Sequence, residues 1–216
     1  LSAYDLVINT LAITDVKANE SRFNQAFTLH VELSRFLARY SKKYVYISTV
    51  AVYSETLDKK PLKKISLSNW YSKTKFFGEP NSRHLTLRIN VIGLESLTKR
   101  SLLEWAYDNL TKNNEITGFE NQFINPVLPS HVFEVVIKYA ENYLDPGIYD
   151  LGSEGIISKY SFIEILAQLL GKKKYLKKGR SAIEDKYQVT SKENAIIVNF
   201  EFKDYVHRYL EEIKRA

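Results

Sequence analysis

Tyr71 and Lys75 are the residues of this sequence whose types and spacing could move a proton. They are four residues apart in the stretch NWYSKTKFFGEP (69–80), so in a helix both side chains lie on one face. A free tyrosine has a pKa of about 10, which is too high for proton exchange at neutral pH. A neighbouring ammonium group favours the phenolate and would lower the pKa of Tyr71 toward the range useful for general acid–base catalysis.

The spacing of this pair is equally typical of an ordinary helix surface, because a chain rich in tyrosine and lysine contains such pairs by chance. The context adds a third group, since the run KYVYIS (43–48) predicts a strand that ends at Ser48 and Thr49. The Thr49 hydroxyl could hold a substrate carbonyl or carbinol oxygen beside the phenol of Tyr71. Such a set suits hydride transfer at a C–OH/C=O centre, with a nicotinamide as hydride donor or acceptor.

These residues have to be positioned by a fold in which short apolar runs alternate with helical patterns. Strands are expected at 5–9, 43–48, 85–89 and 148–151, and helices at 18–40, 71–79, 97–110, 130–143 (with Ser130 as N-cap), 158–170 and 202–214. A polar loop is expected at 55–68. This alternation predicts an α/β fold, a Rossmann-like doubly wound parallel sheet. Ligands of such sheets bind at the carboxyl ends of the strands, here 9–14, 48–53 and 90–93.

The composition limits the class of protein. The chain has 216 residues, a net charge of +6, and no stretch resembling a membrane span or a signal peptide, so we expect no membrane association. It contains no cysteine, which is compatible with a reducing cytoplasm, the expected location. The histidines show no metal-binding spacing, so no metal site is predicted. There is no methionine, even at position 1, so we expect that a segment precedes Leu1 or that methionines are omitted from the sequence.

A basic tract, KKKYLKKGR (172–180), holds six lysine and arginine residues in nine positions. It could be a solvated loop after a helix, where cations are favoured. It could also bind an anionic small molecule, for which the forked donors of Arg180 are suited. Nucleic acid is not the expected partner, because no nucleic-acid-binding signature accompanies the tract.

Five segments in order resemble the extended short-chain dehydrogenase/reductases, and within them the dTDP-4-dehydrorhamnose reductase branch. They are DLVINTLAITDV…E (5–20), YISTVAVY (46–53), YSKTKFFGE (71–79), LRINVIG (87–93) and GIYDLGSEGIISKYSFIEILAQLLG (147–171). The resemblance implies a reductase of a nucleotide-linked 4-keto sugar that uses NADP or NAD. It also implies a small C-terminal substrate lobe. Residues 1–95 would then be the C-terminal portion of the cofactor domain, and 96–216 would add a further strand, helices and the lobe.

The resemblance also assigns roles to single positions. Thr49, Tyr71 and Lys75 match the catalytic residues of the family, and Lys75 would also bind the nicotinamide ribose. The turn beneath the cofactor corresponds to Asn9, Thr10, Leu11 and Ala12, and the substrate contacts correspond to Thr14, Asn90 and Arg180. Three of these have plain alternatives: Asn9 as the cap of a strand end, Thr14 as a helix N-cap and Asn90 as a turn residue.

The chain departs from the family pattern in several places. The glycine motif GxxGxxG is absent, because the first glycine of the chain is Gly78. The pyrophosphate of a dinucleotide therefore has no glycine-rich turn within this sequence. Val50 replaces an Asp of the family, Lys17 replaces another, and His30 replaces an Asn. These departures leave open an epimerase of the same superfamily, or a cofactor-binding regulatory subunit without turnover. A homodimer is compatible with the sequence, which does not specify the oligomeric state.

Overall fold

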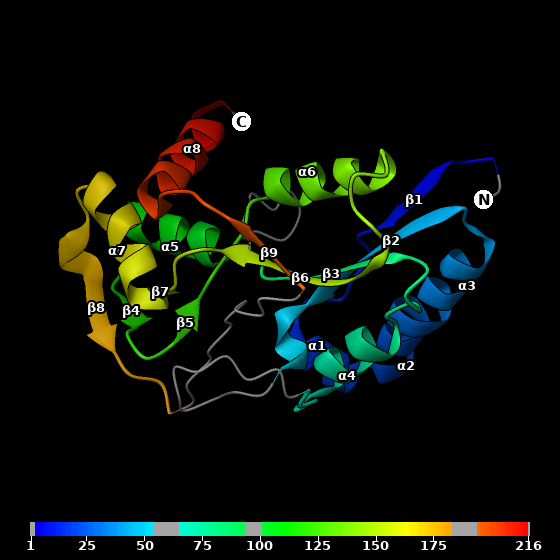
Figure 1. Cartoon of the computed structure of the whole chain (residues 1–216). Coiled ribbons are helices and arrows are strands. Elements are labelled where there is room, and N and C mark those ends of the chain that lie inside the picture. The colour runs from blue at the N-terminus through cyan, green and yellow to red at the C-terminus, as the bar shows by residue number, and fades with distance from the viewer. Residues whose placement is uncertain (1–2, 54–64, 94–100, 183–193, 216) are drawn as a thin grey trace.

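The protein is built around a five-stranded, wholly parallel sheet (Figure 1). The computed structural model describes residues 3–53, 65–93, 101–182 and 194–215. The strands are β1 (Leu6–Asn9), β2 (Lys43–Thr49), β3 (Leu85–Ile89), β6 (Gly147–Ser153) and β9 (Ala195–Val198), in the order β1-β2-β3-β6-β9. The predicted fold class, a Rossmann-like α/β sheet, is confirmed.

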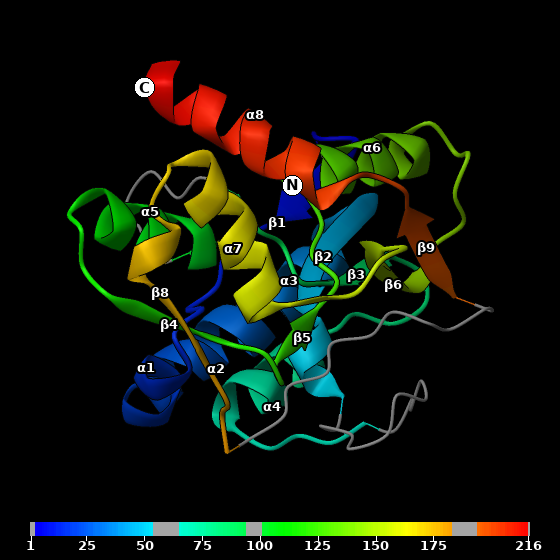
Figure 2. The ribbon, with the colours of Figure 1, turned by 90° about the vertical axis from the view of Figure 1, so that its left-hand side faces the viewer.

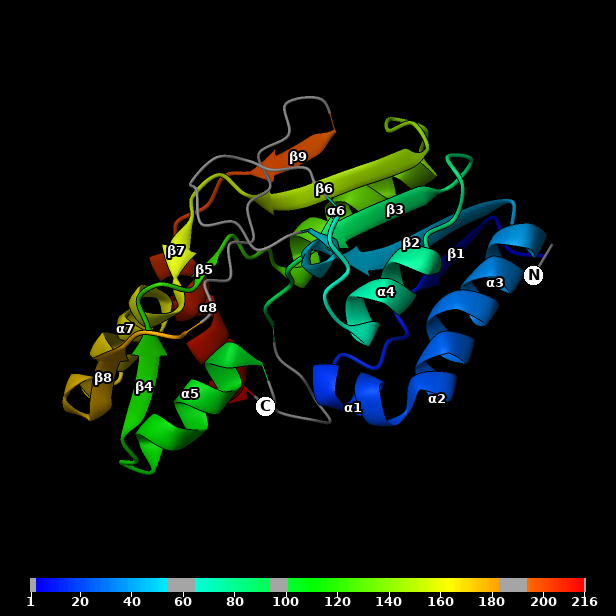
Figure 3. The same ribbon diagram turned by 90° about the horizontal axis from the view of Figure 1, so that it is seen from below.

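Helices cover both faces of this sheet, because its strands alternate residues between the two sides. Tyr44 and Tyr46 of β2 point to one face, where their hydroxyls reach Ser34 and the backbone of His30. Val45 points to the other face and packs in a cluster with Val136. The first face carries α1 (Val16–Ser21), α2 (Phe23–Phe27), α3 (Leu33–Tyr40) and α4 (Trp70–Phe77), whereas α6 (Pro129–Ala140) covers the second (Figures 1 and 3).

The long helix predicted at 18–40 is interrupted by a π-helical turn, η1 (Thr28–Glu32), which lies against α4. The two approach closely at Gly78, directly after α4. A Cβ at Gly78 would lie 1.9 Å from the carbonyl oxygen of His30, so no side chain fits there. Ser34 adds a hydrogen bond of 2.6 Å from its hydroxyl to the Gly78 carbonyl oxygen. The glycine therefore fixes where α4 sits relative to the preceding helices.

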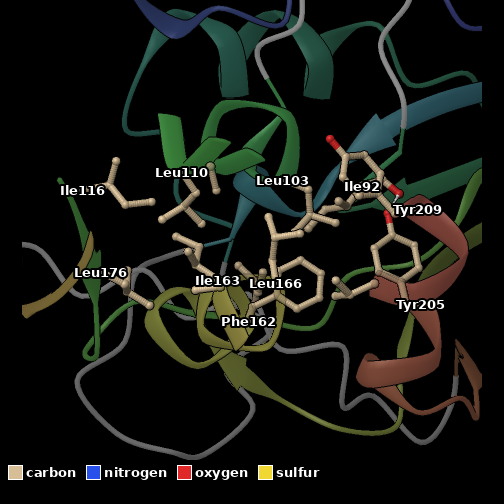
Figure 4. Close-up of a cluster of buried hydrophobic side chains, with 14 residues drawn as sticks. Ile92, Leu103, Leu110, Ile116, Phe162, Ile163, Leu166, Leu176, Tyr205 and Tyr209 are labelled. Carbon is tan, nitrogen blue, oxygen red and sulfur yellow. Dashed lines mark hydrogen bonds between the residues drawn. The ribbon is translucent and has the colours of Figure 1, made fainter. Parts of the chain in front are cut away.

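A second, smaller layer of structure lies at the carboxyl end of the sheet (Figures 1 and 2). It contains α5 (Leu102–Thr111), α7 (Lys159–Leu169), η3 (Lys173–Tyr175), α8 (Phe202–Arg215) and two short sheets. In one of these, β4 (Ile116–Phe119) pairs in parallel with β8 (Leu176–Gly179), and in the other β5 (Phe123–Ile124) pairs antiparallel with β7 (Ile157–Ser158). Leu103, Phe162 and Leu166 are fully buried in the shared core of this lobe (Figure 4).

Several expectations from the sequence need correction. Ser130 is not the N-cap of α6, because the helix begins at Pro129 with Leu128 as its cap. The tract 172–180 is not simply a loop, since it forms η3 and β8. Strands β4, β5, β7, β8 and β9 were not predicted. Most of the predicted loop 55–68 and the start of the helix predicted at 97–110 lie outside the described residues. The boundary between 1–95 and 96–216 stays a prediction; β6 and β9 lie in the second range.

Candidate active site

A cavity of about 660 Å³ opens where β1, β2 and β3 end, at the carboxyl edge of the sheet. Its lining combines polar groups from the strand ends and α4 with apolar groups from the sheet and α6. The lining residues are Ile8, Thr10, Ala12, Thr14, Ile47, Ser48, Thr49, Tyr71, Lys75, Ile89, Asn90, Val91, Pro129, Val132, Phe133 and Val136. Seven of the residues predicted from the sequence thus meet in one place: Thr10, Ala12, Thr14, Thr49, Tyr71, Lys75 and Asn90.

Thr49 and Tyr71 are brought together by the end of β2 and the start of α4. The helix begins at Trp70 because the Asn69 side chain accepts a hydrogen bond from the Ser72 amide at 2.8 Å, and Ser72 reciprocates in a capping box. Tyr71 therefore stands in the first turn, where its phenol interacts with the Thr49 hydroxyl. Burial raises the pKa of Tyr71, and the nearby Thr49 hydroxyl opposes that rise.

Lys75 lies one helical turn after Tyr71 and is only 2% exposed. Its ammonium donates a hydrogen bond of 2.5 Å to the carbonyl oxygen of Ile47 and lies 4.3 Å from the centre of the Tyr46 ring. Burial lowers the pKa of Lys75 to about 7, and the nearby Glu79 carboxylate opposes that shift. The expectation that Lys75 lowers the pKa of Tyr71 is not supported, because burial dominates at Tyr71 and acts in the opposite direction.

The loop after β1 forms one wall of the cavity. Asn9 itself is buried beneath this loop, where its Oδ1 accepts the Leu11 amide at 3.0 Å and its Nδ2 donates to the Tyr44 hydroxyl at 2.9 Å. Leu11 is 54% exposed and does not line the cavity. Thr14 does line it, but is not the N-cap of α1, since Asp15 accepts the Ala18 amide instead. The Asn9 side chain thus caps the end of β1, as its plain alternative predicts, and its place beneath a cofactor stays a prediction.

Asn90 and Arg180, the other two predicted substrate contacts, lie in different surroundings. Asn90 lines the cavity at the end of β3, and its carbonyl oxygen accepts the Val127 amide at 2.9 Å. Arg180 follows β8, is exposed, and forms an ion pair of 2.9 Å with Glu120. It is not among the residues that line the cavity. Its substrate-binding role stays a prediction.

The basic tract that contains Arg180 has most of its charge paired. Lys173 pairs with Glu164, Lys177 with Glu115, and Lys178 with Glu120, at distances of 3.0, 2.6 and 3.5 Å. A tract whose cations already face carboxylates offers less positive potential to a phosphate backbone than its sequence implies.

A buried chain of polar groups supports the cavity from below. Glu79 accepts two hydrogen bonds from Arg88, of 2.9 and 2.7 Å, and a third of 2.7 Å from the Ser48 hydroxyl. Arg88 also donates to the Tyr53 hydroxyl at 2.7 Å, and that hydroxyl donates to Asp150 at 2.6 Å. The chain ties β2, β3 and β6 to the end of α4 and so holds Thr49 and Lys75 in register.

Sequence reasoning missed most of the apolar wall, which comes from Ile8, Ile47 and Ile89 of the strands and from Val132, Phe133 and Val136 of α6. The strand residues share one face by alternation, a signal present in the sequence. That α6 covers this part of the sheet follows only from the three-dimensional arrangement. Phe133 is 60% exposed despite its place in this wall.

The donor set fits the nicotinamide end of a dinucleotide. Thr49, Tyr71 and Lys75 offer hydroxyl, phenol and ammonium groups beside an apolar wall, as a carbonyl-reducing site requires. No glycine-rich turn for the pyrophosphate exists in the sequence before Gly78. Across the described ranges, no group of three or more His, Asp or Glu residues could hold a metal ion. In the same ranges no helix is long and apolar enough to cross a membrane.

Fold and cavity together define the class of protein: an α/β protein with a parallel Rossmann-like sheet and a Thr–Tyr–Lys group at its carboxyl edge. Residues 2–197 match the profile of the RmlD substrate binding domain, and the chain belongs to that family. Comparison with curated protein sequences finds no match.

The solved structures that the chain resembles include dTDP-4-dehydrorhamnose reductases and related epimerases and dehydratases. A reductase from Clostridium acetobutylicum is 18% identical with a TM-score of 0.79, over 98% of this chain and 82% of that one. The Bacillus anthracis reductase, solved with NADP, is 16% identical with a TM-score of 0.75, over 96% and 80%. UDP-glucuronic acid 4-epimerase from Bacillus cereus, solved with UDP-glucuronic acid and NAD, is 18% identical with a TM-score of 0.78, over 99% and 76%. The predicted family resemblance is confirmed.

Proposed function

We propose that the protein is an NAD(P)-dependent reductase of a nucleotide-linked 4-keto sugar. The observation that carries this proposal is the meeting of the Thr49 hydroxyl with the Tyr71 phenol in a cavity that Lys75 also lines. Membership of the RmlD family supports it, as do the solved reductases of the same fold. NADP or NAD is the cofactor class, since structural relatives contain one or the other.

Each residue of the group has a distinct task. When bound, the nicotinamide supplies the hydride. Thr49 donates a hydrogen bond that orients the substrate carbonyl oxygen, and Tyr71 transfers its phenolic proton to that oxygen as negative charge develops there. The phenol of Tyr71 is protonated at neutral pH, as an acid in the reducing direction must be, but burial raises its pKa and makes it a weaker acid, so the bound cofactor and substrate would have to favour release of its proton. Lys75 would hold the ribose end of the cofactor, and its ammonium would offset the negative charge of the phenolate that Tyr71 becomes after transfer.

The apolar wall gives this reaction its surroundings. Ile47, Ile89 and Val136 exclude water from one side of the reacting carbonyl. In a site of low polarity, hydrogen bonds from Thr49 and Tyr71 stabilise a developing oxyanion more than they would in water. The nucleotide part of the substrate would extend from the cavity toward the lobe of α5, α7 and α8.

The test is oxidation of NADPH and NADH by the chain in the presence of a dTDP-4-keto-6-deoxy sugar, with wild type beside Tyr71→Phe. Loss of the acid is expected to reduce kcat by at least about a hundredfold. Tyr40→Phe removes an exposed hydroxyl from α3 and is the matched control. Equal rates for wild type and Tyr71→Phe would refute the role of the phenol. Cofactor binding without turnover on any keto sugar would instead support a regulatory subunit.

A sugar 4-epimerase is the second candidate, because the Bacillus cereus epimerase superposes as well as the reductases do. An epimerase oxidises and reduces the same carbon, so it consumes no cofactor overall. Incubation of a UDP-sugar with catalytic NAD, followed by analysis of the sugar configuration, separates the two activities. A changed configuration at C4 without net cofactor reduction would favour the epimerase. Homodimer formation and a cytoplasmic location stay predictions.

A further inference from the structure

We propose that His30 is a positioning residue that fixes the loop at Ile13, in one wall of the cavity, relative to the helix α4 that carries Tyr71 and Lys75. His30 does not line the cavity and touches no reacting group, so it would act through its two hydrogen-bond partners. The inference rests on the proposed function only where it calls Tyr71 and Lys75 catalytic. The two hydrogen bonds of His30, called the bridge below, do not depend on that function.

The geometry of His30 joins two segments that are distant in the sequence. Its side chain is completely buried. Its Nε2 accepts a hydrogen bond of 2.9 Å from the amide of Ile13, and its Nδ1 lies 2.8 Å from the hydroxyl of Thr74. Thr74 is the residue directly before Lys75 and three after Tyr71. One imidazole ring thus spans the space between the loop that follows β1 and α4.

The partners fix which ring nitrogen carries the proton. The Ile13 amide can only donate, so Nε2 must be the unprotonated acceptor. The Thr74 hydroxyl lies 2.9 Å from the carbonyl oxygen of Trp70, to which it donates, so it accepts from Nδ1–H. The bridge therefore requires neutral imidazole in the Nδ1–H form. Protonation of Nε2 would place two donors against each other and release Ile13.

Surrounding groups hold both ends of the bridge in place. The carbonyl oxygen of Ile13 accepts a hydrogen bond of 2.7 Å from the side-chain amide of Asn19. Both backbone polar groups of Ile13 are therefore bonded to buried side chains, those of His30 and Asn19. On the ring's own backbone, the carbonyl oxygen of His30 accepts the Tyr46 hydroxyl at 3.2 Å. The close approach at Gly78 packs the same turn against α4. The ring therefore has little freedom to move away from either partner.

The charges that face the ring also favour its neutral form. Lys75 and Tyr71 face it from α4, the latter with its ring 6.1 Å away and edge-on, and the Tyr46 hydroxyl of β2 lies against the backbone carbonyl of His30. Burial and, to a smaller extent, the positive charge of Lys75 together lower the pKa of His30 to about 4. The bridge is consequently expected to persist throughout the neutral pH range.

The test begins with nitrogen-15 NMR of the histidine rings in the wild-type chain. We expect His30 to show the Nδ1–H tautomer at neutral pH and to retain it at pH 5.5. Amide exchange then compares His30→Phe with His84→Phe, a matched control that removes another buried histidine whose Nε2 contacts Ala38. The Ile13 amide should exchange about tenfold faster in His30→Phe only, as expected for loss of one hydrogen bond.

Kinetics provide a second readout. Glutamine can accept from Ile13 and donate to Thr74 through its amide, so His30→Gln should recover most of the kcat that His30→Phe loses. If His30→Phe does not fold, Thr74→Val replaces it as the variant that removes one hydrogen bond of the bridge. The tautomer of His30 in the wild type then still tests whether the bridge exists. A protonated or Nε2–H ring at neutral pH would overturn the proposal, as would equal Ile13 exchange in the two phenylalanine variants. Wild type without any turnover would refute the proposed function, whereas the tautomer and exchange would still judge the bridge.

Discussion

The buried ammonium of Lys75 makes a quantitative prediction about stability and pH. The pKa of Lys75 is lowered from 10.5 to about 7 in the folded protein, chiefly by burial. Between these two values the unfolded chain binds a proton that the folded protein has released. Stability therefore rises with pH across this window, because it rises wherever the unfolded state binds more protons. Below a pH of about 7 Lys75 is charged in both the folded and the unfolded state, so the full cost of burying its ammonium lowers the free energy of unfolding.

The size of the effect follows from the two pKa values. One unit of pKa difference corresponds to about 1.4 kcal/mol. From pH 7 to pH 9.5, the Lys75 contribution to the free energy of unfolding should increase by about 3 kcal/mol. Several tyrosines also titrate in the alkaline range, but they are common to wild type and variant. The difference between wild type and Lys75→Met isolates the lysine.

The assay is urea denaturation of both proteins at half-unit steps from pH 7 to pH 9.5. The free energy of unfolding of wild type should gain on that of Lys75→Met throughout the series. Lys73→Met removes a partly exposed lysine from the same helix and is the reference. A difference between wild type and Lys75→Met that is independent of pH would show that Nζ is solvated or compensated. The reasoning from burial would then be wrong.

Other features of the molecule lead to predictions of the same kind. Arg88→Met leaves the buried carboxylate of Glu79 without its main partner and should lower the free energy of unfolding by about 3–5 kcal/mol. Adding Glu79→Gln to this variant should restore part of the lost free energy, because the unpaired charge is then removed. If the double variant is no more stable, the loss does not come from the buried charge. Gly78→Ala should destabilise by about 1–3 kcal/mol in chemical denaturation, because its Cβ meets the His30 carbonyl oxygen; an unchanged midpoint would mean that α4 shifts freely. Phe162→Ala should cost about 3–5 kcal/mol, since the ring is fully buried in the lobe core; a loss below 1 kcal/mol would show a core that refills the space. The pKa of His30 is about 4 in the folded protein and 6.5 in the unfolded chain, so between these values the unfolded chain binds more protons and stability falls as the pH falls. From pH 6.5 to pH 4 the free energy of unfolding of wild type should fall by about 2.5 kcal/mol relative to that of His30→Gln. Parallel plots of the free energy of unfolding against pH for the two proteins would refute this prediction.

The sheet and its helices could be predicted largely from the sequence. The runs at 5–9, 43–48 and 85–89 are short, apolar and bounded by polar residues, which is typical of buried parallel strands. Strand β9, with the sequence AIIV, carries the same signal and was missed although the sequence shows it. Strand β8 could not be predicted in the same way. The sequence LKKG of β8 is mostly cationic, and its pairing with β4 depends on backbone hydrogen bonds rather than on side-chain pattern.

The meeting of Thr49 and Tyr71 could also be foreseen, because parallel strands place their carboxyl ends at one edge. The electrostatics of the site could not. Spacing puts Lys75 on the same helix face as Tyr71, but only the packing of α4 against β2 directs its ammonium to the Ile47 carbonyl oxygen. Burial, which no local pattern specifies, then outweighs the mutual influence of the two groups. His30 gives no sequence signal of its position between two segments.

The last residues of the chain complete two separate parts of the molecule. β9 closes the side of β6 that faces away from β3, and α8 supplies Tyr205, Val206 and Tyr209 to the core of the lobe. During synthesis on the ribosome, neither part can therefore reach its final packing until residues 195–209 have emerged. A stop codon near residue 194 would leave an unpaired strand edge and an open apolar core at the same time. We expect such a shortened chain to aggregate or be degraded rather than to persist with the cavity intact.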